Sequence, residues 1–284
     1  MDRTIRLLIS CPDKVGIVAA VSDFIAQRGG WMTEANYHAD RDTGQFFMRS
    51  EILAQSLSVD SEQFRADFAV LADGFDMQWQ FSDSDVRKKV VLMASHASHC
   101  LADILHRWHS GELECDIVGV VANHENLRSM VEWHKIPYHF INFKDREKAE
   151  ANAEVEATLA TMAPDVVVLA RYMQIIPASL CQQYHGRMIN IHHSFLPSFV
   201  GANPYQKAFD RGVKLVGATC HYVTEQLDEG PILDQDVIRV SHRDSKEDMV
   251  RLGKDVEQQV LARGLRAHLQ DRIVVQGNKT VIFD

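Results

Sequence analysis

In the N-terminal part of the chain, apolar side chains recur with two different periods. Ile5, Leu7 and Ile9 occupy every second position, the period of a β-strand with one buried face. Ile17 and Val21 instead follow the spacing of an amphipathic helix. Together the two periods predict the order strand, helix, strand, strand, helix, strand of a ferredoxin-like α+β domain. The expected strands cover residues 4–10, 31–40, 45–54 and 77–81, and the expected helices cover residues 15–29 and 62–71.

From residue 89 onward the apolar runs are continuous rather than alternating, as in residues 117–121. Strands of this kind, separated by helical segments, are typical of a parallel sheet with helices on both faces. We therefore expect an α/β protein in which a Rossmann-like, mostly parallel-sheet domain follows the polar linker at residues 82–85. The predicted domains are residues 1–84 and 85–284. The expected later strands cover residues 89–94, 117–121, 138–141, 165–169 and 188–191, the helices 101–108, 127–133, 147–162 and 246–269, and further extended segments 215–223, 232–240 and 273–283.

Composition limits the classes of partner. The 284 residues carry 30 lysine and arginine against 39 aspartate and glutamate side chains, a formal charge of −9, which argues against nucleic acid or a membrane surface as partner. No apolar run reaches the length of a membrane span or follows the pattern of a signal peptide. The five cysteines are scattered, which favours reduced thiols and a cytoplasmic location. Small molecules are therefore the expected partners.

Two polar side chains, Asn190 and His192, close the predicted strand at residues 188–191. In a strand they project from one face, near the carboxyl end where open parallel sheets bind ligands. A carboxylate, Asp228, follows in a turn before Gly230-Pro231. An amide and an imidazole can stabilise an oxyanion, and a carboxylate can orient the imidazole or activate the attacking group, so the set predicts attack on a carbonyl. Taken singly, each residue also has a structural explanation as a strand end, a core histidine or a turn.

The loop Cys11-Pro12-Asp13-Lys14-Val15-Gly16-Ile17 follows the first predicted strand. Together with the order of elements, it resembles the ACT domains, regulatory modules that commonly bind amino acids and pair through their sheets. The resemblance implies a homo-oligomer and an amino-acid effector, such as glycine or methionine, bound near Asp13, Val15 and Gly16. A structural interpretation stays open beside it, in which Asp13 caps a helix and Gly16 allows close packing.

Three motifs occur in order in the second part of the chain: Leu169-Ala170-Arg171-Tyr172-Met173-Gln174-Ile175-Ile176, Asn190-Ile191-His192-His193-Ser194-Phe195-Leu196-Pro197, and His221-Tyr222-Val223 with Asp228-Glu229-Gly230-Pro231. From about Lys88 onward the chain resembles the formyltransferases that use formyltetrahydrofolate. The resemblance implies a folate substrate, no cofactor, and catalytic roles for Asn190, His192 and Asp228. It also implies substrate contacts from the segments that match the family's pterin-binding backbone. In this sequence those residues are Met173, Gln174, Ile175, Ile176, Thr224 and Glu225.

The segment after the first strand of the second domain bears on what accepts the formyl group. Transferases that act on a phosphorylated amine need a glycine-rich turn there to hold the phosphate, whereas this chain has Ser95-His96-Ala97-Ser98-His99-Cys100. A second histidine, His193, follows the catalytic imidazole and could order an attacking water. We therefore expect hydrolysis of 10-formyltetrahydrofolate to formate and tetrahydrofolate.

Two other functions stay open at this point. One is transfer of the formyl group to an amine such as glycinamide ribonucleotide. The other is a regulatory binding protein with a vestigial catalytic domain, which the presence of all three catalytic residue types argues against. His96, His99 and Cys100 also suggest a zinc site, but their spacing is not that of a standard ligand set and no fourth ligand is evident. We expect no metal.

Overall fold

The computed structural model describes residues 2–198 and 204–283, which form two compact units. Unit 1 comprises Met1–Arg87, Gln270–Gln276 and Val281–Asp284, and unit 2 comprises Lys88–Leu269 and Gly277–Thr280. By their contacts, residues 270–276 and 281–284 therefore belong to unit 1. The predicted boundary places them in the second domain. The expected fold class, which combines a ferredoxin-like unit with a mostly parallel α/β sheet, is confirmed.

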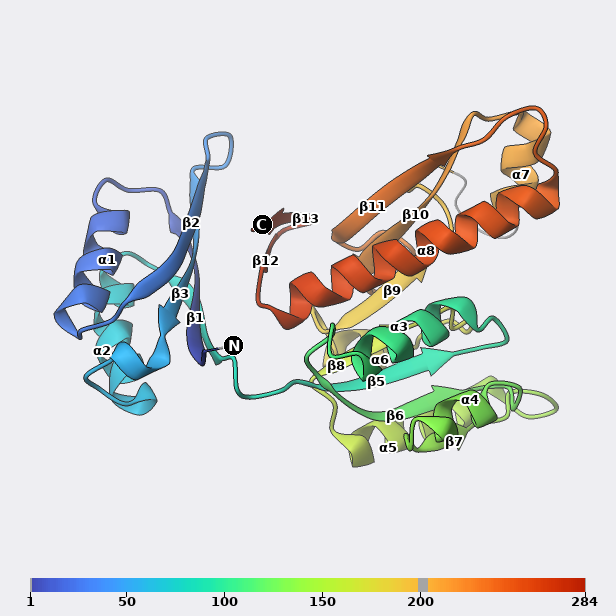
Figure 1. The fold of residues 1–284 in the computed structure, drawn as a ribbon, viewed down its shortest axis with the longest axis horizontal. Helices are drawn as coiled ribbons and strands as arrows, with labels where there is room; N and C mark the ends of the chain where they lie inside the picture. The colour runs from blue at the N-terminus through green and yellow to red at the C-terminus, as the bar shows by residue number, and fades with distance from the viewer. Residues whose placement is uncertain (1, 199–203, 284) are drawn as a thin grey trace. The chain divides into compact units, whose positions relative to one another are not determined.

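Unit 1 contains an antiparallel sheet with helices on one face (Figure 1). Its elements are β1 (Thr4–Pro12), α1 (Ile17–Gln27), β2 (Met32–Asp40), β3 (Gln45–Leu53), η1 (Ala54–Ser56), α2 (Ser61–Gly74) and β4 (Gln78–Asp83). The strand order is β2-β3-β1-β4. Phe24 of α1 packs edge-on against Phe64 and Phe68 of α2, because the apolar residues of each helix fall on its sheet-facing side.

The other face of this sheet is covered by the C-terminal residues of the chain. The last strands are β12 (Ile273–Gln276) and β13 (Lys279–Ile282). Leu8 and Phe47 of the sheet are buried with Phe283, and Val274 and Val281 pack against them. The two apolar faces of the sheet are thereby both used within unit 1.

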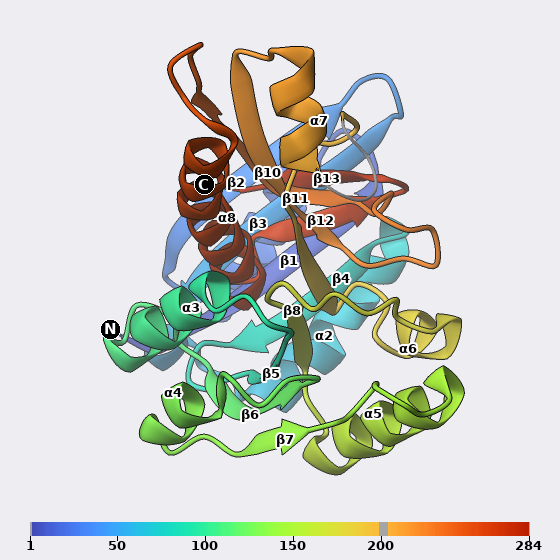
Figure 2. The ribbon, with the colours of Figure 1, turned by 90° about the vertical axis from the view of Figure 1, so that its right-hand side faces the viewer.

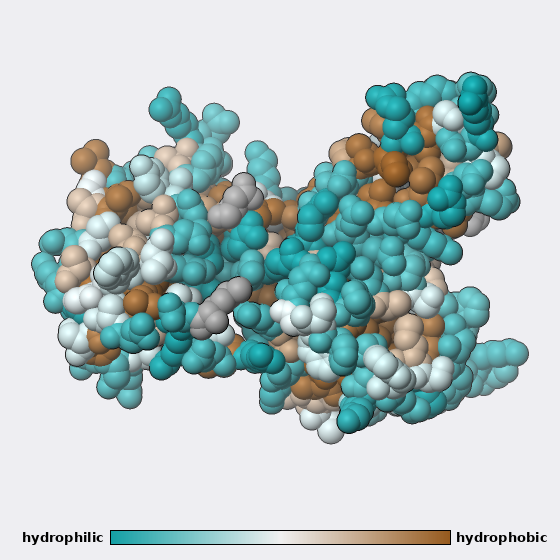
Figure 3. Space-filling view, viewed as in Figure 1, coloured by the Kyte–Doolittle hydropathy of each residue, from teal (hydrophilic) through white to brown (hydrophobic). Residues whose placement is uncertain are grey.

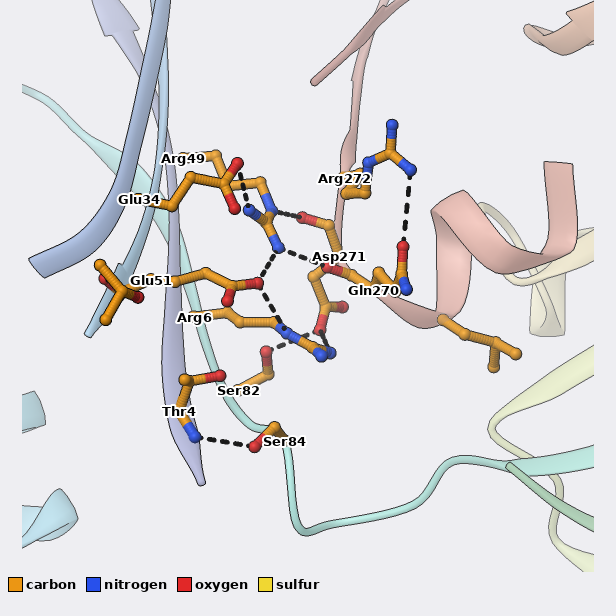
Figure 4. A network of polar contacts seen from close by, with 12 residues as sticks. Thr4, Arg6, Glu34, Arg49, Glu51, Ser82, Ser84, Gln270, Asp271 and Arg272 are labelled. Atoms are coloured by element: carbon orange, nitrogen blue, oxygen red, sulfur yellow. Dashed lines mark hydrogen bonds and ion pairs between the residues drawn. The ribbon is translucent and has the colours of Figure 1, made fainter. Parts of the chain in front are cut away.

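Buried charges reinforce this contact (Figure 4). Arg49, whose side chain is 2% exposed, donates hydrogen bonds to the main-chain oxygens of Gln270 and Asp271, each at 3.1 Å. Its guanidinium also pairs with Glu51 and, at 3.2 Å, with Glu34. Because a buried guanidinium is stable only when its donors and its charge are paired, the C-terminal segment is an integral part of unit 1.

Unit 2 holds the larger sheet. Its strands are β5 (Lys89–Ala94), β6 (Asp116–Ala122), β7 (Tyr138–Phe140), β8 (Val166–Leu169), β9 (Met188–His192), β10 (Leu215–Tyr222) and β11 (Ile232–Arg239). Its helices are α3 (His99–His109), α4 (Arg128–Trp133), α5 (Lys148–Met162), α6 (Ala178–Gln183), α7 (Pro204–Arg211) and α8 (Lys246–Leu269). In the order β11-β10-β9-β8-β5-β6-β7, strands from β7 to β9 pair in parallel, and β9, β10 and β11 pair antiparallel. Because β5 lies between β6 and β8, successive crossovers run to opposite sides of it, the arrangement that opens a ligand crevice in α/β sheets.

Helices cover both faces of the unit 2 sheet (Figure 2). On one face, Leu159 of α5 and Leu180 of α6 are buried with Val91 and Met188 of the strands. On the other face, α8 packs against α3 and along β9, β10 and β11. Burial on both sides explains why β5 and β8 lack polar alternation in their sequences.

The surface view shows one mostly hydrophilic face, with apolar side chains gathered over β10 and β11 beside α7 (Figure 3). Exposed apolar residues of these three elements include Phe209, Leu215 and Val237. Within residues 2–198 and 204–283, no helix has the length and apolar character needed to cross a membrane.

Candidate active site

The carboxyl end of β9 carries the amide and the imidazole that were predicted to act together. Asn190 and His192 alternate with the buried Ile191 and so share one face of the strand. His192 is the last residue of β9, which extends one residue further than expected. On the neighbouring β10, His221 lies opposite Asn190 in the antiparallel register, with its Nε2 3.1 Å from the Asn190 amide nitrogen.

Asp228, in the loop between β10 and β11, brings a carboxylate to both imidazoles. Its backbone φ of 59° lies in the left-handed region, which aspartate and asparagine tolerate better than most residues. Oδ2 lies 3.2 Å from His192 Nδ1, and Oδ1 lies 3.7 Å from His221 Nε2. Burial alone would raise the pKa of the Asp228 carboxyl, but its close contacts with the imidazoles of His192 and His221 outweigh burial and hold that pKa well below its usual value. Asp228 is therefore an anion at neutral pH.

Hydrogen-bond partners determine which ring nitrogens are open to a ligand. His221 Nδ1 lies 2.9 Å from the main-chain oxygen of Tyr222, an acceptor only, so this nitrogen carries the proton. His192 directs Nδ1 to Asp228, and its Nε2 is buried without a hydrogen-bond partner in the described part of the chain. Nε2 of His192 and the amide of Asn190 are thus placed to receive a carbonyl oxygen.

A cavity of about 460 Å³ opens at these groups. Asn190, His192 and Asp228 all line it, as does every residue predicted to contact the substrate. Those residues are Met173, Gln174, Ile175, Ile176, Thr224 and Glu225. Met173 and Ile175 are 59% and 74% exposed, so the cavity presents apolar surface beside its polar end, as ligand sites commonly do.

The proposed effector residues Asp13, Val15 and Gly16 lie elsewhere, in the loop before α1 of unit 1. Asp13 does not cap α1, because the N-cap is Gly16 and no side chain bonds to the cap. Gly16 has a φ of 97°, and nothing lies within 4 Å of an added Cβ, so glycine is favoured by a backbone conformation that other residues rarely adopt and not by close packing. The structural interpretation of this loop was therefore wrong on both points, and its role in effector binding stays a prediction.

The segment Ser95–Cys100 contributes to a second cavity, of about 550 Å³, which His96 and His99 both line. His99, Cys100 and Glu257 place possible metal ligands within 4.8 Å of one another. Burial raises the pKa of the Cys100 thiol well above its usual value, which disfavours the thiolate that binds metals. His99 Nε2 lies 2.7 Å from Glu257, so these two groups already satisfy each other.

Two residues near the site, His221 and Glu257, were not expected from the sequence. Glu257 is 1% exposed on α8, between the buried Val256 and Val260. A carboxylate within the apolar stripe of a long helix could have been recognised in the sequence as a buried charge, which needs a buried partner. His221 gave no such signal, because its contact with Asn190 depends on the register between β9 and β10.

Comparison with known proteins agrees with this geometry. A family model described as formyl transferase matches residues 88–265. A formyltetrahydrofolate deformylase from Synechocystis sp. is 45% identical over 281 residues, which cover 99% of this chain and 98% of that protein. The crystal structure of a formyltetrahydrofolate deformylase from Pseudomonas syringae pv. tomato superposes with a TM-score of 0.98 at 61% identity and covers 100% of this chain and 95% of that chain. A glycinamide ribonucleotide transformylase 1 from Symbiobacterium toebii has a TM-score of 0.67 at 25% identity and covers 70% of this chain and 95% of that one.

Proposed function

Since the chain belongs to the formyl transferase family and, within it, to the formyltetrahydrofolate deformylases, we propose that Asn190, His192 and Asp228 carry out the hydrolysis of 10-formyltetrahydrofolate to formate and tetrahydrofolate. The observation that supports these roles best is the distance of 3.2 Å between the Asp228 carboxylate and His192 Nδ1. Both residues line the same cavity as Asn190. Transfer of the formyl group to an amine is the reaction of the wider family.

In the proposed reaction, the formyl oxygen accepts hydrogen bonds from the Asn190 amide and from Nε2 of a protonated His192. The oxygen of a water molecule forms a bond to the formyl carbon, and the carbon–N10 bond then breaks. N10 takes the electron pair and a proton, and formic acid releases a proton to become formate. Donors that are already in place stabilise the negative charge on the formyl oxygen without reorganisation, which lowers the barrier.

Asp228 and His193 are proposed to act on the water. The ionised Asp228 orients His192 and can accept a proton from the attacking water. His193 is the first residue after β9 and lines the same cavity as His192. In a continued strand its side chain would point to the face opposite His192. Burial, with a smaller effect from the charge of Arg171, lowers the pKa of His193 to about 4. Its neutral ring can accept a hydrogen bond from water at neutral pH.

We propose that the pterin lies against Met173, Gln174, Ile175 and Ile176, with Thr224 and Glu225 from the second loop. These residues line the cavity that also contains the three catalytic groups. Amide hydrolysis by side chains and water needs no electron or group carrier, so we infer that the enzyme uses no cofactor.

We further propose that residues 1–84 regulate the enzyme and that residues 85–284 carry its chemistry. The active-site cavity is formed by unit 2, while unit 1 has a ferredoxin-like sheet and core of its own. The proposed effector is an amino acid bound near Asp13, Val15 and Gly16, in a homo-oligomer. The five cysteines are all free and buried, which supports a cytoplasmic location.

The direct test is to incubate the purified protein with 10-formyltetrahydrofolate and no amine, and to measure formate. We expect one formate for each tetrahydrofolate formed, and no increase when glycinamide ribonucleotide is added. Negligible formate without the amine, with formylated nucleotide in its presence, would instead establish a transferase.

A further inference from the structure

A buried carboxylate, Glu257, lies next to the active-site cavity and is shared by several partners. It accepts hydrogen bonds from Tyr205 Oη and from His99 Nε2, each at 2.7 Å. Arg171 Nε lies 3.5 Å from the same carboxylate. Burial alone would raise the pKa of Glu257, but the hydrogen bond from His99 and the charge of Arg171 hold it below its usual value. Glu257 is thus an anion that accepts its hydrogen bonds from Tyr205 and His99 and none from Arg171.

Arg171 is left with donors that the fold does not use. Its side chain is 15% exposed, and within residues 2–198 and 204–283 its buried Nε and Nη1 have no hydrogen-bond partner. The contact with Glu257 is therefore an ion pair and not a hydrogen bond. The backbone of Arg171 also has a φ of 64°, a conformation unfavourable for a residue with a side chain. Unsatisfied buried donors on a strained residue are typical of a functional group.

The charges around the cavity indicate what these donors bind. Of the described residues that line it, Arg171 is the only lysine or arginine, whereas Asp228 and Glu225 are carboxylates. Hydrolysis creates formate in this cavity, where the ionised Asp228 would repel it. A guanidinium group offers a carboxylate both the opposite charge and N–H donors, and Nε and Nη1 of Arg171 are open.

We propose that Arg171 is the binding site for the carboxylate product, formate, and that Glu257 is its counter-ion while the site is empty. This inference rests on the proposed function, because only the hydrolysis places formate in the cavity. The reaction offers one other source of a carboxylate, the glutamate portion of the folate. The buried position of the open nitrogens favours the one-carbon acid over that larger group.

The test measures binding of sodium formate to the intact protein in the absence of folate, by saturation-transfer NMR on the formate proton. Arg171→Met, which removes the charge and the donors, is expected to weaken binding about tenfold or more. Arg171→Lys should weaken it less, because the charge remains without the planar fork. Glu257→Gln should tighten binding about threefold, since the guanidinium then lacks a competing anion. Arg187→Met, at an exposed cation that does not line the cavity, is the matched control and should bind formate as the wild type does.

The opposite signs expected for Arg171→Met and Glu257→Gln separate binding from a folding defect, which would weaken both. Equal formate binding by the wild type and a folded Arg171→Met variant would overturn the proposal, as would absence of formate binding by the wild type. Loss of tetrahydrofolate binding without loss of formate binding would assign Arg171 to the glutamate portion and would equally overturn it. Formate binding that depends on Arg171 in a protein that releases no formate from 10-formyltetrahydrofolate would contradict the proposed function but not the anion site.

Discussion

At the scale of single residues, the left-handed backbone of Asp228 determines which substitution tests its charge alone. Asn has the same size and tolerates a φ of 59°, so Asp228→Asn should keep the fold while His192 loses its anionic partner. We expect turnover to fall on the order of a hundredfold or more, with tetrahydrofolate binding unchanged. His192→Ala should lose a similar factor. Steady-state kinetics and ligand-binding titrations measure both effects.

The matched control for Asp228→Asn is Glu229→Gln, which removes the next carboxylate along the chain. Glu229 is exposed and does not line the cavity, so its variant should turn over at the wild-type rate. Wild-type turnover in a folded Asp228→Asn variant would remove this carboxylate from the mechanism.

His193 gives the protein a predictable dependence of stability on pH. Its pKa of about 4 in the folded state lies below the value of about 6.5 for an unfolded chain, so the unfolded state binds more protons between these values. Stability should therefore rise with pH across this window, by at most ~3 kcal/mol from this residue. Urea unfolding of the wild type and of His193→Gln at pH 4.5, 5.5, 6.5 and 7.5 measures the contribution. Equal slopes for the two proteins would show that His193 does not titrate as described.

Sequence alone could group Asn190 with His192, because period-two geometry is a local property of one strand. It could not place Asp228 beside them without the family resemblance, since Asp228 follows α7 and β10 in the chain and reaches β9 only because β10 pairs with it. His221 illustrates the same limit. Its side chain reaches Asn190 only because β10 pairs with β9 in one register, and a shift of one residue would turn it to the other face.

At the scale of elements, α8 shows a conflict between helix propensity and packing. A Cβ built on Gly253 would lie 2.0 Å from Oη of Tyr205, which donates to Glu257. Ala would favour the helix by about 1 kcal/mol, but overpacking and a displaced Tyr205 hydroxyl should cost about 2–4 kcal/mol together. We therefore expect Gly253→Ala to be destabilising by about 1–3 kcal/mol in urea unfolding.

Gly74→Ala is the control for this substitution. Gly74 ends α2, and nothing lies within 4 Å of an added Cβ. Its variant should be neutral or slightly stabilising, by no more than about 1 kcal/mol. A stabilised Gly253→Ala variant would mean that Tyr205 can move away without loss.

Most elements were predicted close to their observed limits, but two of the short helices were not predicted. The limits of β5 and α8 match the expected residues 89–94 and 246–269. By contrast, α6 and α7 were missed, because six and eight residues span too few turns to establish an apolar stripe. The start of α1 shows a further limit, since its N-cap is Gly16 with a φ of 97° and not Asp13, whose side chain the sequence offered as a cap.

At the scale of the whole molecule, the C-terminal residues follow unit 2 in the sequence but make their contacts largely within unit 1. Residues 273–283 were predicted to be extended, and they form β12 and β13, but the surface that these strands cover was not predicted. The apolar runs at residues 273–275 and 281–283 predict burial, but they do not identify the residues that cover them. Leu8 and Phe47 at the start of the chain supply that partner, and Arg49 bonds the adjoining main chain. Residues 270–276 and 281–284 thus belong to unit 1 because of their packing, although they are far from residues 1–87 in the sequence.

This arrangement determines how the proposed regulatory and catalytic parts of the chain can be tested separately. A variant that retains residues 88–284 loses Leu8 and Phe47 but keeps Phe283 and its apolar neighbours, so it should aggregate. A variant that retains residues 88–269 keeps the residues lining the active-site cavity and omits that apolar tail. We expect the second variant to elute as a single species in size-exclusion chromatography and to release formate without any response to amino acids. The full chain should respond to glycine or methionine in the same assay. Equal solution behaviour of the two variants would show that the C-terminal residues do not need unit 1, and an amino-acid response retained by residues 88–269 would place the effector site in unit 2.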